Sequence, residues 1–158
     1  MTPLLELKRM AYELTNRFNC LLFGSLGLLY TYPEVLDTTP HDADFMTDSN
    51  RDNLAAIIRF LQKSDYTVYS WQDPIVEGFD MDVLPGRIYI RGIKYIQGFS
   101  PAIIDITYEL INFPFKEMLP LTVVKDGIRI LNKDGYIYSL GLCVKQKQLK
   151  RREILMNL

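Results

Sequence analysis

Cysteine and histidine are scarce in this chain, and their scarcity excludes several kinds of site. The 158 residues include two cysteines, Cys20 and Cys143, and one histidine, His41. The cysteines lack the spacing of a metal site and two alone make no disulfide framework, so we expect a reducing compartment. A single histidine leaves little room for a histidine-based zinc centre or a serine triad.

Long apolar runs and glycine-rich nucleotide motifs are also missing. The most apolar stretch, Cys20 to Tyr30, is about half of what a membrane span needs. Glu6, Lys8 and Arg9 interrupt the start, where a signal peptide would carry an apolar core. The sequence has no P-loop lysine motif and no G-x-G-x-x-G run. We therefore expect a soluble, cytoplasmic protein that does not associate with membranes.

Charge is nearly balanced over the whole chain but uneven along it. Lysine and arginine number 18 against 19 acidic residues, which gives a formal net charge of −1. This balance argues against a nucleic-acid footprint spread over the whole surface. The stretch KQKQLKRR, residues 145–152, carries five positive charges and no negative one. Such a run is commonly a solvated helix face, and it is also suited to contact phosphates.

The pattern of apolar residues predicts one domain of mixed α/β type. Apolar positions recur at helical spacing after Pro3 and from Arg51 to Lys63, where Asn50 and its neighbours offer N-caps. Helix and strand do not alternate regularly, so we predict a mixed, mostly antiparallel sheet with helices packed mainly on one side. The domain is expected to span residues 1–158 and to end in a basic helix over about 134–157.

Short apolar or alternating runs predict the strands. They are Cys20–Phe23, Ala43–Met46, Tyr66–Trp71 and Ala102–Leu110, with one or two more within Val123–Leu131. Arg87–Ile90 and Ile93–Ile96 flank an Arg-Gly pair and are predicted to form a hairpin. Residues 33–41 hold two prolines and two threonines and are predicted to be a loop.

Three aspartates lie within predicted strands. Asp42 and Asp44 share one face of their strand, because alternate side chains point the same way. Asp105 is embedded in the apolar run AIIDITYEL, where an unpaired buried acid is costly. If the two strands lie side by side, three carboxylates converge. Mg²⁺ prefers carboxylate oxygen, water and phosphate, and would offset their repulsion.

Gly24 and Ser25 end the first strand, before a short helical segment over about 26–32. At a helix N-terminus, backbone N–H groups and the Ser25 hydroxyl are well placed for phosphate oxygens. Gly24 has no Cβ, which lets a triphosphate approach the backbone closely. The turn therefore predicts a phosphate-binding element opposite the acids.

An apolar strand, Gly-Ser, a spacer, Asp-x-Asp and a later lone Asp in a strand resemble the nucleotidyltransferase superfamily that includes DNA polymerase beta. The likeness is closest to its small prokaryotic members. The resemblance implies that Gly24 and Ser25 bind nucleotide phosphates. It also implies that Asp42, Asp44 and Asp105 are catalytic and hold two Mg²⁺ ions, or Mn²⁺ in their place.

The C-terminal basic run and the spacer extend the comparison. The family places lysines and arginines on a helix after a short strand, which implies a nucleotide-binding role for Lys145 and draws attention to Lys147, Arg151 and Arg152. The sixteen residues from Leu26 to His41 form a longer spacer than is usual in the family. We expect His41 to be a solvated loop histidine, with contact to metal or nucleotide, or a role as a base, as the alternatives.

The activity implied by the resemblance is Mg²⁺-dependent nucleotidyl transfer. A nucleoside monophosphate would move from an NTP, with ATP expected, to an acceptor hydroxyl, and pyrophosphate would leave. The acceptor stays open between a small molecule, a protein and a nucleic-acid end. A second copy of the chain or a helical partner chain is expected to complete the cleft. The alternatives are a non-catalytic interaction protein on the same fold, antitoxin-like or an assembly factor, and a nuclease-like use of the same acids.

Overall fold

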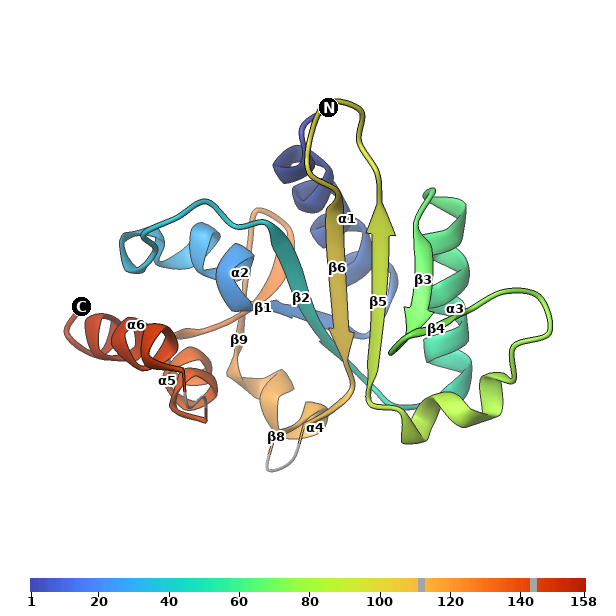
Figure 1. Cartoon of the computed structure of the whole chain (residues 1–158). Helices are drawn as coiled ribbons and strands as arrows, with labels where there is room; N and C mark the ends of the chain where they lie inside the picture. The colour runs from blue at the N-terminus through green and yellow to red at the C-terminus, as the bar shows by residue number, and fades with distance from the viewer. Residues whose placement is uncertain (111–112, 143–144) are drawn as a thin grey trace.

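An eight-stranded sheet forms the centre of the protein, whose computed structural model describes residues 1–110, 113–142 and 145–158 (Figure 1). The strand order is β4-β3-β5-β6-β2-β1-β10-β9, and a separate two-stranded sheet pairs β7 with β8. The pairings β1–β10 and β2–β6 are parallel, and the others are antiparallel. The predicted mixed, mostly antiparallel sheet is therefore confirmed.

The bounds of the elements are as follows. The strands are β1 Cys20–Phe23, β2 Asp42–Thr47, β3 Thr67–Ser70, β4 Asp73–Pro74, β5 Tyr89–Lys94, β6 Ala102–Thr107, β7 Glu109–Leu110, β8 Phe113–Pro114, β9 Thr122–Lys125 and β10 Ile128–Leu131. The α-helices are α1 Pro3–Arg17, α2 Gly24–Thr31, α3 Arg51–Lys63, α4 Phe115–Met118, α5 Lys133–Gly141 and α6 Gln146–Met156. Short 3₁₀ turns are η1 Pro33–Val35, η2 Met81–Gly86 and η3 Leu119–Leu121.

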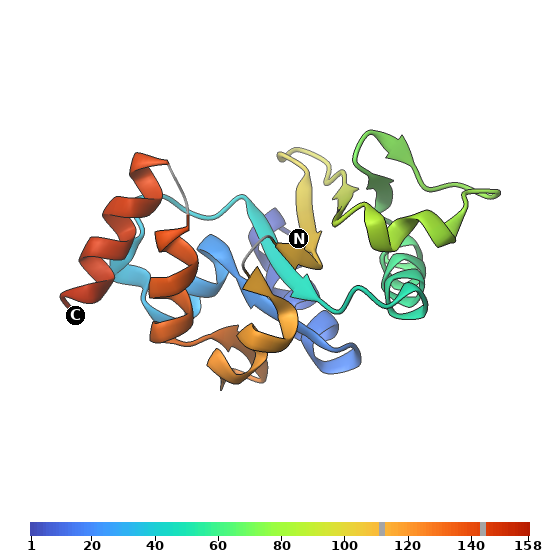
Figure 2. The same ribbon diagram turned by 90° about the horizontal axis from the view of Figure 1, so that it is seen from below.

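Helices α1 and α3 cover one face of the sheet, whereas α5 and α6 pack together at one end of it (Figures 1 and 2). The Thr2 hydroxyl caps α1 by accepting from the Leu5 N–H at 3.2 Å. The Asn50 side chain caps α3 by accepting from the backbone N–H groups of Asp52 and Asn53. Each cap satisfies helix N–H groups that would otherwise lack a partner, which explains why both helices begin where the sequence predicts.

The core lies between these helices and the central strands. The apolar side chains of α1 and α3 that recur at helical spacing are fully buried, as are alternate residues of β2 and β6: Leu7, Met10, Leu14, Leu54, Ile57, Ile58, Leu61, Ala43, Phe45, Ile104 and Ile106. Burying one side chain of this size stabilises the fold by about 1.5–3 kcal/mol. Because this face of β2 and β6 packs into the core, the intervening polar residues point to the opposite face.

The hairpin predicted around Arg91 and Gly92 is wrong. Residues Tyr89–Lys94 form one continuous strand, β5, which pairs with both β3 and β6. Position 92 of this strand is a glycine because a Cβ there would press on the ring of Tyr66, whose Cδ2 would be 3.3 Å away. The glycine thus allows close packing against the core and does not mark a turn.

The single helix predicted over 134–157 is also wrong, because the segment forms two helices, α5 and α6. Gly141 ends α5, and a Cβ on it would lie 2.8 Å from Nε of Arg152. The same Nε donates to the Ile137 carbonyl at 2.9 Å. The absence of a side chain at the helix end lets the chain fold back and pack α6 on α5. Residues 143–144, which include Cys143, lie outside the described residues.

Within the described ranges, none of the helices combines the length and apolar character that crossing a membrane requires.

Candidate functional site

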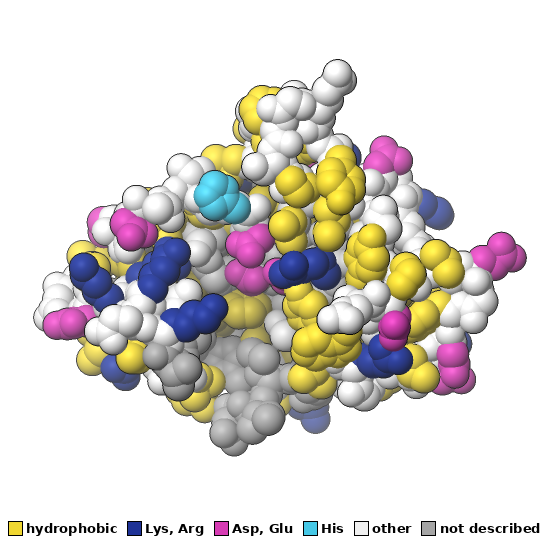
Figure 3. Space-filling model, viewed as in Figure 1, with side chains coloured by type: hydrophobic (Ala, Val, Ile, Leu, Met, Phe, Trp, Pro, Cys, Tyr) yellow, Lys and Arg dark blue, Asp and Glu magenta, His cyan; other side chains and the backbone are white. Residues whose placement is uncertain are grey.

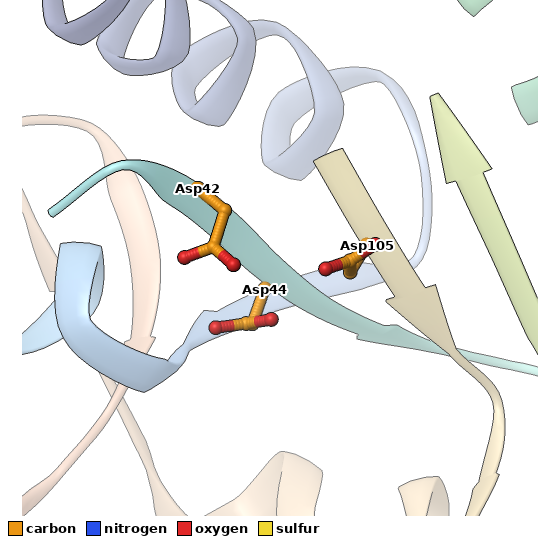
Figure 4. Close-up of side chains that lie close together, drawn as sticks. All are labelled: Asp42, Asp44 and Asp105. Carbon is orange, nitrogen blue, oxygen red and sulfur yellow. The ribbon is translucent and has the colours of Figure 1, made fainter. Parts of the chain in front are cut away.

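The register of the central strands brings the three aspartates together. Asp44 lies directly opposite Asp105 in the parallel pair β2–β6, and Asp42 precedes Asp44 by two residues on the same face. One carboxylate oxygen from each of the three lies within 4.8 Å of the others. Figure 4 shows the three side chains directed toward a common space. The predicted convergence is therefore confirmed.

The three carboxylates of the cluster repel one another unless a cation binds to them or one of them is protonated. Burial, followed by the charges of Asp42 and Asp105, raises the pKa of Asp44 to about 8. Burial and then the charge of Asp105 also raise the pKa of Asp42. Within the described ranges, neither Asp42 nor Asp44 forms an ion pair. A set of three carboxylates matches the hard, oxygen-seeking ions Mg²⁺ and Mn²⁺, so the residues fit the metal that the fold resemblance implies.

Asp105 differs from the other two acids because it is already paired. Arg91 donates from Nε to Oδ1 at 2.7 Å and from Nη2 to Oδ2 at 3.1 Å. The Tyr89 hydroxyl donates to Oδ1 at 2.5 Å. Burial and then the hydrogen bond to Asp105 raise the pKa of Tyr89 well above its usual range, so the phenol keeps its proton.

Sequence reasoning missed both partners of Asp105. The signal was present, because Tyr89 and Arg91 are two residues apart and share a face of any strand that contains both. The predicted hairpin ended one strand at Ile90 and so separated them. Had Gly92 been interpreted as a close-packing position, the same alternation would have placed an arginine on the face of the acids.

The Gly24–Ser25 turn lies against the acids, as predicted. Gly24 has a φ of +68° and begins α2, and a Cβ there would overlap the Asp44 carboxylate. Only glycine satisfies both the left-handed backbone and the close approach. The Gly24 carbonyl accepts from the buried Tyr136 hydroxyl at 3.0 Å, which holds the turn to α5.

The basic pocket, which lies beside the turn, is lined by three basic side chains of α6 and by two acidic ones of the spacer. Arg151, only 4% exposed, donates from Nη1 to the Ser25 hydroxyl at 2.9 Å. Its Nη2 lies 3.8 Å from the Asp37 carboxylate, which comes from the long spacer. Lys147 and Lys150 line the same pocket of about 410 Å³ between η1 and α6. Figure 3 shows basic side chains of this end of the molecule next to the central acidic ones.

Two predicted positions lie at the edge of this arrangement. Lys145 is the exposed N-cap residue of α6, and the described cation that contacts Ser25 is Arg151. A nucleotide-binding role for Lys145 stays a prediction. His41 is exposed just before β2 and lines a smaller pocket with Phe99 and Pro101, and its charge acts to lower the pKa of the adjacent Asp42 against the larger effect of burial.

Comparison with known proteins finds the fold but no close relative. No family model matches this chain, and no curated protein matches it. The solved structure of JHP933 from Helicobacter pylori is similar, with a TM-score of 0.54 and 18% identity over 96% of this chain. A candidate nucleotidyltransferase from H. pylori is similar with a TM-score of 0.54 and 16% identity over 93% of this chain.

The likeness covers this chain almost completely but the solved proteins only in part. This chain spans 65% of JHP933 and 64% of the other protein, which is less than two thirds of each. At such low identity the comparison concerns the fold and not the chemistry. The chain therefore has a nucleotidyltransferase-like fold.

Proposed function

We propose that the chain is a Mg²⁺-dependent nucleotidyltransferase that moves a nucleoside monophosphate from an NTP, ATP in the first instance, to an acceptor hydroxyl. The observation that carries the proposal is the convergence of Asp42, Asp44 and Asp105 within 4.8 Å, on the face of the sheet that adjoins the Gly24–Ser25 turn. Neither feature alone indicates this chemistry. Their contact supports a carboxylate metal site next to a helix N-terminus suited to phosphate.

The phosphates of the nucleotide would lie between the turn and α6. The first N–H groups of α2 lack intrahelical partners and carry the positive end of the helix dipole. Arg151 adds a buried positive charge at Ser25, and Lys147 and Lys150 add two more at the pocket next to it. This arrangement would bind a triphosphate by charge-assisted hydrogen bonds on the side opposite Asp105.

The transfer itself needs positioning and charge neutralisation more than a covalent nucleophile. The acceptor oxygen forms a bond to the α-phosphorus, the bond to the β-phosphate oxygen breaks, and pyrophosphate leaves with that electron pair. The Asp105 carboxylate accepts the hydroxyl proton once Arg91 has released it. Divalent ions held by the three acids would neutralise the phosphate charge that develops in the transition state.

The acceptor would approach from the Asp105 side of the sheet. We propose that a second copy of the chain, or a helical partner chain, completes that side of the cleft. Light scattering tests this point independently of the chemistry: a dimer or a co-purifying partner supports it, whereas a monomer that transfers nucleotide to an acceptor unaided contradicts it.

A non-catalytic interaction protein is the second candidate, and one observation favours it. Asp105 accepts three hydrogen bonds from Tyr89 and Arg91, so it is not a free carboxylate. A protein that had lost metal chemistry could keep such a pair for stability alone. Nucleotide binding separates the two candidates.

Thermal unfolding with and without nucleotide is the discriminating experiment. At a hundred times its dissociation constant, a ligand stabilises the folded state by about 2.7 kcal/mol. The transferase predicts stabilisation by an NTP that requires Mg²⁺ and is lost in Asp42→Asn. The matched control is Asp65→Asn, which changes an exposed aspartate away from the site and should keep the effect. Absence of any nucleotide effect would favour the interaction protein.

Product analysis separates transfer from nuclease chemistry. Nucleotidyl transfer releases pyrophosphate from the NTP, whereas a nuclease releases nucleotides from a nucleic acid. Pyrophosphate formation that depends on Mg²⁺ and on Asp42 supports the proposal. Nucleotide release from an oligonucleotide, without pyrophosphate from NTP, would contradict it.

A further inference from the structure

Arg91, Asp105 and Asp44 form a row across three neighbouring strands. Arg91 of β5 lies opposite Asp105 of β6, and Asp105 lies opposite Asp44 of β2. The guanidinium holds both oxygens of Asp105, so it stands at the edge of the carboxylate cluster, on the side away from the Gly24–Ser25 turn. The cluster therefore contains one fixed positive charge that the protein itself supplies.

The pair is more constrained than an ordinary surface ion pair, which contributes little. The Asp105 side chain is only 12% exposed, and it receives a bidentate arginine and a tyrosine hydroxyl. Tyr89 is held in turn by the Trp71 ring, whose centroid lies 5.1 Å from its own. The Trp71 indole N–H donates to the Arg87 carbonyl at 2.6 Å.

The backbone on either side of this stack is strained. Trp71 has a φ of +56° and Ile88 a φ of +58°, a region that bulky and β-branched residues rarely adopt. Such strain persists only where the surrounding structure enforces it, and it concentrates at functional sites. Here Ile88 directly precedes Tyr89, and Trp71 packs on the Tyr89 ring from the end of β3.

Counting charges shows what Arg91 does to the cluster. Once a divalent ion has displaced the proton of Asp44, the three carboxylates carry three negative charges, and Arg91 reduces the sum to two, which that single ion balances. Nucleotidyl transfer of the proposed kind uses two ions. Asp105 is the carboxylate that would help to hold a second ion, and each of its oxygens already accepts a hydrogen bond from Arg91.

We propose that Arg91 is a positioning residue that holds Asp105 in place of the second divalent ion until a nucleotide is bound. This inference rests on the proposed function. The Arg91 side chain is 42% exposed, so its guanidinium can leave Asp105 on the solvent side without displacing the core. A phosphate group offers it an equivalent bidentate partner. Tyr89 keeps one hydrogen bond to Asp105 after the arginine leaves, which preserves the orientation of the carboxylate.

The consequence is an ordered assembly of the site. Without nucleotide, Asp42 and Asp44 would hold one divalent ion while Arg91 neutralises Asp105. With nucleotide, the phosphates would draw Arg91 away and leave Asp105 free to help hold a second ion. The site is thereby completed only when there is a substrate to react.

The test is Mn²⁺ binding to the nucleotide-free protein, followed by the electron paramagnetic resonance signal of free Mn²⁺. Wild type should bind about one ion per chain, and Arg91→Gln should bind about two, because the second position of a two-metal site becomes available. The overall affinity should rise about tenfold in Arg91→Gln, equivalent to ~1.4 kcal/mol. Unchanged or weaker Mn²⁺ binding in Arg91→Gln would overturn the inference.

Arg87→Gln is the matched control. Arg87 precedes the same strand and donates to Asp73 at 2.7 Å, but Asp73 does not belong to the carboxylate cluster. Its replacement should leave Mn²⁺ binding at the wild-type level. An equal gain in Arg87→Gln and Arg91→Gln would show that removing any positive charge suffices, and would overturn the specific role of Arg91.

Tyr89→Phe and Arg91→Lys keep the test decisive if Arg91→Gln does not fold. Tyr89→Phe leaves the guanidinium on Asp105 and should stay at about one ion per chain, whereas Arg91→Lys loses the bidentate hold and should gain affinity. The same measurements distinguish failure of the Arg91 inference from failure of the proposed function. If Asp42→Asn abolishes Mn²⁺ binding but the Arg91 variants match wild type, only this inference fails. If neither wild type nor the Arg91 variants bind Mn²⁺, the proposed function fails with it.

Discussion

Asp44 is the residue at which stability and proposed function are most strongly opposed. It is packed against Gly24 and close to Asp42 and Asp105, and burial raises its pKa to about 8. Near neutral pH the folded protein therefore holds a proton on Asp44 that the unfolded chain, with an ordinary carboxyl pKa of about 3.9, has released. Ionising Asp44 in the folded state costs free energy, so the contribution of Asp44 to stability falls as pH rises.

The first prediction follows from the sign of that shift. Between about pH 4 and pH 8 the native state binds more protons at Asp44 than the unfolded state, so its contribution to stability falls as pH rises. Asp44→Asn should remove this fall and raise the melting temperature of the metal-free protein at pH 8 by about 5 °C. Calorimetry at pH 5 and pH 8 measures it, with Asp65→Asn as the control. A variant less stable than wild type at pH 8 would contradict the assignment.

The second prediction concerns Gly24. Gly24→Ala should destabilise the protein through both its left-handed backbone and the overlap with Asp44. Gly98→Ala is the control, because Gly98 has a φ of +82° but a Cβ there would meet nothing within 4 Å. Gly98→Ala should lose about 1–2 kcal/mol for the backbone alone, and Gly24→Ala clearly more. Equal losses in urea unfolding would show that the close approach to Asp44 is unimportant.

At the scale of elements, one buried acid adds a polar connection between α1 and the sheet to the apolar packing of the helix. Glu6 is 1% exposed and accepts from Arg9 on its own helix, from the Tyr66 hydroxyl at 2.7 Å and from Lys94 of β5 at 3.3 Å. Burial acts to raise the pKa of Glu6, but the hydrogen bonds from Arg9 and Tyr66 outweigh it and the pKa is lowered. The helix is thus joined electrostatically to the strand that carries Arg91.

The third prediction is that Glu6→Gln loses about 3 kcal/mol of unfolding free energy, as when one partner of a buried pair is removed. The contribution of Glu6 is present above its ordinary pKa and is lost as pH falls through the lowered native value, so the difference from wild type should shrink in acid. Glu13→Gln removes only an exposed pair with Arg17 and should lose less than about 0.5 kcal/mol. Similar losses in the two variants would contradict this attachment.

Elements with both a periodic apolar face and a cap could be predicted from the sequence. Helix α3 occupies Arg51–Lys63 as expected, because four fully buried apolar residues at helical spacing and the Asn50 cap both indicate it. The shared face of Asp42 and Asp44 could be predicted too, because it follows from the alternation of side chains along a strand. Their proximity to Asp105 could be predicted only on the assumption that two distant strands pair.

The failures have local physical causes. From the sequence alone, Gly92 suggests a turn and Gly141 lies inside one continuous predicted helix. Each position is a glycine because a distant side chain lies against it, Tyr66 at Gly92 and Arg152 at Gly141. Such packing between remote segments leaves no local pattern in the sequence. The Arg91–Asp105 pair was missed for the same reason, since it depends on β5 being one strand.

At the scale of the whole molecule, the acidic cluster of the central strands and the basic residues of α6 lie on the same face. The acids lie on the central strands β2 and β6, and the lysines and Arg151 lie on α6 at one end (Figure 3). The long spacer, residues 26–41, lies between the acids and α6. It contains most of α2 and all of η1, contacts α6 through η1 and ends at β2. It forms part of the basic pocket, so its length does not displace the acids from the Gly24–Ser25 turn.

The fourth prediction is that Lys147→Gln with Lys150→Gln weakens Mg²⁺-dependent NTP binding, by about tenfold, or ~1.4 kcal/mol, for each lysine–phosphate hydrogen bond that the substitutions remove. The salt dependence of binding should fall in parallel, because fewer charges are neutralised. Lys63→Gln, at the exposed end of α3, should change neither. Titration calorimetry at two salt concentrations measures both quantities, and an unaltered affinity in the double variant would place the phosphates elsewhere.

The most direct measurement is a crystal structure with Mn²⁺ and a non-hydrolysable NTP, in which anomalous scattering locates the ions. The account predicts Mn²⁺ between Asp42, Asp44 and Asp105, phosphates against Gly24 and Ser25, and Arg91 withdrawn from Asp105. Bound nucleotide away from the turn, with Arg91 still on Asp105 and no ion among the three carboxylates, would contradict it.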